Sequence, residues 1–85
     1  MKQVFLDVRS REEHLSDGID GSLNIPHNTI MNNLQQLPEG REILIYCHSG
    51  TKSAIVAMVL EKLGYNVMNI ETIDMAKNIF GNRYE

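Results

Sequence analysis

The sequence contains one cysteine, and its surroundings favour an ionised thiol. Cys47 follows the apolar run 43–46 and precedes a compact polar stretch that continues to Lys52. Gly50 and the small residues around it allow this stretch to curl with several backbone N–H groups pointing inward, and the helix expected after it adds the positive end of its dipole. Both features stabilise a thiolate, so the pKa of Cys47 should lie below the ~8.5 of a free cysteine.

Lys52 adds a positive charge at the rim of this loop. The loop can therefore hold an anion even though the whole chain is acidic, because the local field governs binding. A lone cysteine at the end of an apolar strand is also commonly a small buried hydrophobic residue. Spacing alone does not decide between these two interpretations.

The elements that must position Cys47 are indicated by alternating patterns along the chain. Ser10 and Glu13 match a capping box at the start of a short helix that ends near residue 16. Three further helices are predicted at residues 30–37, 54–63 and 73–80. Short apolar runs predict strands at residues 4–8, 22–25, 43–46 and 65–70.

This alternation predicts an α/β fold with a small, mostly parallel sheet and helices on both faces. We expect residues 1–85 to form one domain, with Cys47 at the carboxyl edge of the sheet, where ligands bind in such folds. The helix at 54–63 is apolar nearly all round, which predicts that it is deeply buried. The methionines are expected to fill the core; they are Met31, Met58, Met68 and Met75.

Composition limits the function classes. The formal net charge is −3, so there is no excess of Lys and Arg with which to bind nucleic acid or an anionic membrane. The longest apolar run, residues 54–60, is far shorter than the ~20 residues that span a bilayer. A strand that begins by residue 3 leaves no room for a secretory signal peptide, so we expect a cytoplasmic protein.

The same residue counts argue against a metal site or a disulfide framework. One cysteine excludes a disulfide within the chain and a cysteine-rich zinc site. The three histidines are too widely spaced to predict a metal centre. We expect His14 to be solvated and His27 to lie on the surface or near the mouth of the site. His48 is expected to point outward, because the amides of its loop must point inward.

Four segments, taken in order, resemble the single-domain rhodanese family. They are D-V-R-S-R-E-E at 7–13, G-I-D-G-S-L-N-I-P at 18–26, I-Y-C-H-S-G-T-K-S at 45–53 and L-G-Y at 63–65. The resemblance implies a sulfurtransferase that works without a cofactor. In that family a thiolate takes the outer sulfur of a small anionic donor such as thiosulfate. The resulting persulfide then passes the sulfur to cyanide or to a thiol, which a protein can supply.

The resemblance also implies roles for residues of this chain. Cys47 is the nucleophile and sulfur carrier, and Lys52 steers the anion. Asp7 and Arg9 look like the pair that braces the loop. The family's histidine is replaced by Gly18, and Glu71-Thr72 stands where a Gly-Gly pair is common. The residues expected to bind the substrate are those of the loop: His48, Ser49, Gly50, Thr51, Lys52 and Ser53.

Two other functions remain open. One is a non-catalytic domain, or a sulfur carrier that acts only with a protein partner. The other is a cysteine phosphatase or arsenate reductase, which needs a bidentate cation to hold an oxyanion. The sixth residue after Cys47 is Ser53 rather than arginine, and the point charge of Lys52 cannot replace that fork.

Overall fold

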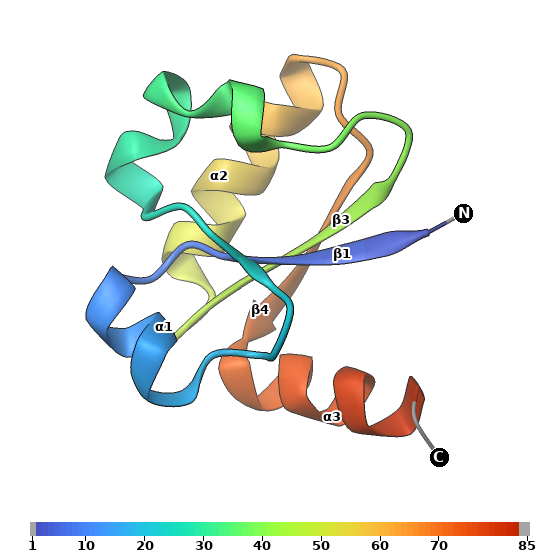
Figure 1. Ribbon diagram of the computed structural model, residues 1–85. Helices are drawn as coiled ribbons and strands as arrows, with labels where there is room; N and C mark the ends of the chain where they lie inside the picture. The colour runs from blue at the N-terminus through green and yellow to red at the C-terminus, as the bar shows by residue number, and fades with distance from the viewer. Residues whose placement is uncertain (1, 84–85) are drawn as a thin grey trace.

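The computed structural model describes residues 2–83, which form four strands, three α-helices and two 3₁₀ segments (Figure 1). In chain order they are β1 (Gln3–Asp7), α1 (Arg11–Asp17), β2 (Leu23–Asn24), η1 (His27–Asn32), η2 (Leu34–Gln36), β3 (Glu42–Cys47), α2 (Thr51–Lys62), β4 (Val67–Thr72) and α3 (Ile73–Arg83). Among the described residues, no helix has the length and apolar character needed to cross a bilayer.

The strands form one sheet in the order β2-β1-β3-β4, and every neighbouring pair is parallel. In the central pair, Leu6 lies beside Ile45 and Asp7 beside Tyr46. The carboxyl ends of β1 and β3 therefore meet at the same edge of the sheet. The next residue of β3 is Cys47, which therefore lies at this edge as predicted. The parallel sheet with its connecting helices confirms the predicted α/β fold.

Side chains that alternate along the strands supply two separate cores. Leu6 and Ile45 pack with Val56 and Leu60 of α2 on one face. On the other face, Phe5, Leu44 and Tyr46 pack with Ile73 and Ala76 of α3. Figure 1 shows α2 and α3 on opposite sides of the sheet. The prediction of helices on both faces is confirmed.

The helix that follows the cysteine loop begins earlier than expected. It starts at Thr51 rather than at Ala54, because Gly50 adopts a φ of 91° and acts as its N-cap without a side-chain hydrogen bond. The Ala54 N–H donates to the carbonyl of Gly50 at 3.1 Å. The loop between β3 and α2 is consequently only three residues long, and Ser53 lies in the first turn of the helix.

The prediction of an all-round buried α2 is wrong. Ile55 and Met58 are 58% and 59% exposed, and only one side of the helix contacts the sheet. The other three methionines assigned to the core are also exposed; they are Met31, Met68 and Met75. Residues 2–83 provide one layer of helices on each face of the sheet, and none of them covers the outer side of α2.

The α-helix predicted at 30–37 is replaced by the two 3₁₀ segments. Thr29 Oγ1 donates to the carbonyl of Pro26, and Asn33 Nδ2 donates to the carbonyl of Thr29. Such side-chain bonds to nearby carbonyls compete with regular helical pairing. Ile30 and Leu37 are nevertheless buried against α2. The prediction that these apolar residues face the core is confirmed, and the prediction of an α-helix is wrong.

Candidate active site around Cys47

The Cys47 sulfur lies at the end of β3 beside two backbone N–H donors and the hydroxyl of Ser53. The Gly50 N–H is 2.9 Å from Sγ, and the Ser53 N–H is 3.4 Å away. The Ser53 hydroxyl oxygen is 3.3 Å from Sγ. Gly50 makes this convergence possible, because its left-handed φ turns the chain so that successive N–H groups face the sulfur.

These donors decide the ionisation of the thiol. Burial raises the pKa of Cys47, since a thiolate loses hydration. Hydrogen bonds from the Ser53 hydroxyl and from the backbone N–H groups of Ser53, Gly50 and Ser49 act in the opposite direction. The donors outweigh burial, so the pKa of Cys47 lies below its ordinary value.

Cys47 is only 3% exposed, but it lines a cavity of about 400 Å³. Three segments form the walls: residues 9–13 after β1, residues 26–28 after β2, and the cysteine loop itself, which contributes His48, Ser49 and Lys52. A second cavity of about 430 Å³, lined by residues 38–41 and 63–66, lies at the amino ends of the strands. The cavity at Cys47 contains the only thiol of the chain, so it is the candidate site.

The six expected loop residues divide into two groups. Gly50 and Ser53 are buried against the sulfur. The other four are exposed, and Thr51 alone among them does not line the cavity. In the described part of the chain Lys52 forms no ion pair, so its charge is available to an anion at the rim.

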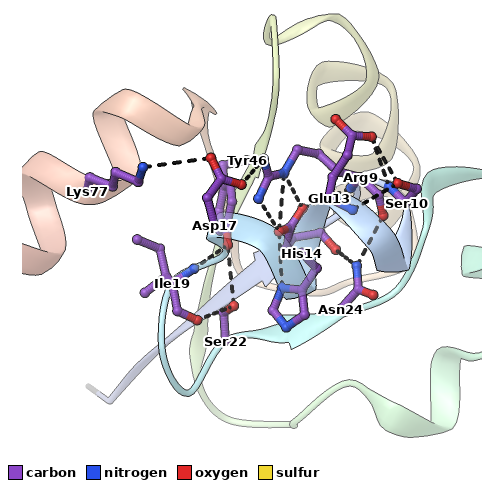
Figure 2. Close-up of polar contacts among 11 residues, drawn as sticks. Arg9, Ser10, Glu13, His14, Asp17, Ile19, Ser22, Asn24, Tyr46 and Lys77 are labelled. Atoms are coloured by element: carbon purple, nitrogen blue, oxygen red, sulfur yellow. Dashed lines mark hydrogen bonds and ion pairs between the residues drawn. The ribbon is translucent and has the colours of Figure 1, made fainter.

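Asp7 and Arg9 form a buried ion pair at the end of β1 (Figure 2). Asp7 Oδ1 accepts from the Arg9 backbone N–H at 2.9 Å, and Oδ2 accepts from Nη2 at 2.9 Å. Arg9 Nη1 donates to Asp17 at 2.8 Å, and the guanidinium lies 5.7 Å from the centre of the Tyr46 ring. Arg9 thus pairs with two carboxylates on the α3 side of the sheet. These contacts fix the turn between β1 and α1, which lines the cavity.

The prediction of a solvated His14 is wrong. His14 Nδ1 lies 3.1 Å from Asp7 Oδ2, so the imidazole joins the Asp7–Arg9 pair (Figure 2). Gly18 makes room for this ring, since a Cβ at that position would lie 2.4 Å from Nδ1. Asp7 ends β1 and His14 lies in α1, so no helical spacing in the sequence indicates this contact.

Two further residues of this region were missed. Asn24 Nδ2 donates to the carbonyls of Asp7 and Arg9 at 3.1 Å each, which ties β2 to the turn that walls the cavity. Glu71, at the end of β4, has a φ of 72° and accepts a hydrogen bond from the Ser53 hydroxyl at its carbonyl. Neither contact leaves a local pattern in the sequence, because each joins segments that are far apart in the chain.

Comparisons with known proteins agree with this geometry. The sequence pattern of the family described as "Rhodanese-like domain" matches residues 1–72. A crystal structure of a rhodanese-like domain protein from Staphylococcus aureus superposes with a TM-score of 0.74 at 28% identity, covering 85% of this chain and 86% of that one.

Two curated relatives are longer proteins. The chain is 38% identical over 66 residues to the Bacillus subtilis (strain 168) protein named "Putative sulfur carrier protein YrkF", covering 76% of this chain and 36% of the relative. It is 32% identical over 76 residues to a tRNA sulfurtransferase of Thermoplasma acidophilum, covering 89% of this chain and 15% of the relative. The chain thus spans well under half of either relative.

Proposed function

The chain belongs to the rhodanese-like domain family, and from this we propose that it is a sulfurtransferase that carries sulfur as a persulfide on Cys47. The observation that supports this most strongly is the set of donors converging on Sγ, with the Gly50 N–H at 2.9 Å. A thiolate is the nucleophilic form of cysteine, and these donors favour it. The proposed chemistry needs no separate base to remove the thiol proton.

In the first half-reaction the Cys47 thiolate attacks the outer sulfur of a donor such as thiosulfate. A new S–S bond forms on Cys47, the S–S bond of the donor breaks, and sulfite leaves with the bonding electron pair. The persulfide that remains is anionic, so the N–H groups of Gly50 and Ser53 suit it as they suit the thiolate. Lys52 at the rim is the cation that would attract the donor and the departing sulfite.

In the second half-reaction an acceptor attacks the outer sulfur of the persulfide. Cyanide would leave as thiocyanate and a thiolate as a new persulfide, and in each case the electron pair of the broken S–S bond returns to Cys47. The cavity of about 400 Å³ can admit a small acceptor or the end of a protein segment. We place this chemistry in the cytoplasm, where a free cysteine stays reduced.

The test is intact-mass spectrometry after incubation with thiosulfate. The wild-type protein should gain the mass of one sulfur atom, and a reducing agent should remove it. The Cys47→Ala variant should gain nothing, while Lys62→Gln, which changes a side chain at the far end of α2, should gain the same mass as wild type. No gain on the wild type, or an equal gain on Cys47→Ala, contradicts the proposal.

A sulfur carrier that works only with a protein partner is the second candidate, supported by the name of the Bacillus subtilis relative. The persulfide would then form, but cyanide and small thiols would not discharge it. Measuring loss of the added sulfur in the presence of these acceptors separates the two functions. A phosphatase is disfavoured, because buried Ser53 stands at the loop position that would need a bidentate cation.

A further inference from the structure

The end of β4 is irregular beside the Ser53 hydroxyl. Ile45 of β3 pairs with Asn69 and the next residue, Tyr46, pairs with Glu71, so β4 contains one extra residue, Ile70. Glu71 follows with a φ of 72°, a conformation that residues other than glycine seldom adopt. The side-chain oxygen of Asn69 accepts a hydrogen bond from the Glu71 N–H at 3.0 Å, which holds this turn.

This turn brings Glu71 against the cysteine loop. The Glu71 carbonyl oxygen is 3.3 Å from Ser53 Oγ, and Ser53 is fully buried. A Cβ built on Gly50 would lie 3.2 Å from the Cβ of Glu71, so the two segments are in contact. The left-handed residue Glu71 therefore contacts both residues that bond the sulfur, Gly50 and Ser53. Strained backbone conformations cluster at functional sites.

The Ser53 hydroxyl has one proton and three acceptors within reach. They are the Gly50 carbonyl at 3.1 Å, the Glu71 carbonyl at 3.3 Å and the Cys47 sulfur at 3.3 Å. When Cys47 is a thiol, its S–H can donate to Oγ and the hydroxyl can donate to a carbonyl. When Cys47 is a thiolate, the hydroxyl must turn to the sulfur and give up that carbonyl.

The Gly50 carbonyl already accepts the Ala54 N–H at 3.1 Å, as the first hydrogen bond of α2. The Glu71 carbonyl lies outside the helix, on the turn that Asn69 holds by accepting from the Glu71 N–H. We propose that Glu71 is a positioning residue whose carbonyl competes with Cys47 Sγ for the Ser53 proton and so limits how far the loop stabilises the thiolate. This inference rests on the proposed function, since the competition for the Ser53 proton sets the fraction of Cys47 that is a nucleophilic thiolate before a sulfur donor binds.

The experiment measures the rate of Cys47 alkylation by iodoacetamide from acid to alkaline pH, which gives the pKa of the only thiol in the chain. Asn69→Ala removes the acceptor that holds the Glu71 turn. The Ser53 proton should then be freer to bond the thiolate, so the pKa of Cys47 should fall. Alkylation near neutral pH should rise about fivefold, the factor expected for the net contribution of one hydrogen bond.

Four control variants test whether the effect passes through the Ser53 hydroxyl. Asn69→Ser keeps an oxygen that can bond the N–H two residues on, so it should stay close to wild type. Glu71→Gly keeps the left-handed turn and should leave the pKa near its wild-type value, and Glu71→Gln isolates the loss of the carboxylate charge. In a Ser53→Ala background, Asn69→Ala should have no further effect, because the competing proton is gone.

The side chains that could alter the pKa of Cys47 by their charge are unchanged in the Asn69 variants; they are Arg9, Glu13, His27, His48, Lys52 and Glu71. If Asn69→Ala does not fold, Glu71→Val provides a second route, since a β-branched residue resists a positive φ. An unchanged pH profile in a folded variant overturns the proposal, as does a shift that persists without Ser53. Alkylation needs no sulfur donor, so this result is independent of whether a persulfide forms.

Discussion

The acidity of the site is decided at one atom, Cys47 Sγ, where burial and hydrogen bonding oppose each other. Two backbone N–H groups and one hydroxyl converge on this sulfur, and they come from a segment that Gly50 bends. The sequence predicted this loop because its cause is local: an apolar strand, a glycine and the start of a helix. The partner of Ser53 at Glu71 was not predictable, since 18 residues separate them.

Ionisation of Cys47 should be visible in the stability of the fold. Because the pKa of Cys47 is lower in the folded protein than in the unfolded chain, the unfolded state binds more protons between the two values. The free energy of unfolding should therefore rise with pH from the folded pKa to the unfolded value of ~8.5 and then level off. As the pH falls through the folded pKa, this contribution is lost.

Urea unfolding of the wild type and of Cys47→Ser, carried out from about pH 6 to about pH 10, isolates this contribution because serine does not titrate in that range. The difference between the two free energies should grow toward alkaline pH and reach a plateau. Parallel curves over the whole range would show that the folded protein does not stabilise the thiolate.

At the scale of elements, periodicity predicted which segments pair and pack but not how much of each is covered. Val56 and Leu60 of α2 lie in the core as their spacing indicates. Ile55 and Met58 are also apolar, yet they are exposed, because no other part of residues 2–83 covers that side of α2. An apolar composition all round a helix therefore does not show that every side is buried; the number of layers in the fold decides that.

Substitutions on the two sides of α2 should differ sharply in their effect on stability. Leu60 is 0% exposed, so Leu60→Ala should lower the free energy of unfolding by about 2–5 kcal/mol through lost burial and a cavity. Met58→Ala, on the outer side of the same helix, should change it by less than ~0.5 kcal/mol. Urea unfolding measures both, and a cost above ~2 kcal/mol for Met58→Ala would mean that this side is covered in solution.

For the whole molecule, the net charge and the charge at the cavity rim have opposite effects on an approaching anion. The formal net charge of −3 opposes the approach of an anion. Arg9 also lines the cavity, but its guanidinium is already paired with Asp7 and Asp17, so it does not offset the net charge there. Lys52 lies at the rim of the cavity, at the start of α2. We therefore expect it to carry most of the local attraction for an anionic donor.

Lys52→Gln should slow the second-order formation of the persulfide from thiosulfate several-fold at low ionic strength, and the difference should shrink in high salt as the charge is screened. Lys62→Gln is the matched control, because it removes the same charge at the far end of α2. The measurement is the time course of mass gain at several salt concentrations. Equal rates for Lys52→Gln and wild type at low salt would assign the attraction to the backbone N–H groups alone.

The position of β4 in the sheet has a consequence for how the protein behaves at high concentration. Among the described residues β4 borders no strand on its outer side, so it presents free peptide groups that a strand of a neighbouring molecule could join. The extra residue at Ile70 and the left-handed Glu71 interrupt this edge after Asn69. An incoming strand would find only the first few residues of β4 regular, so this irregular turn shortens the edge on which strands of two molecules could pair.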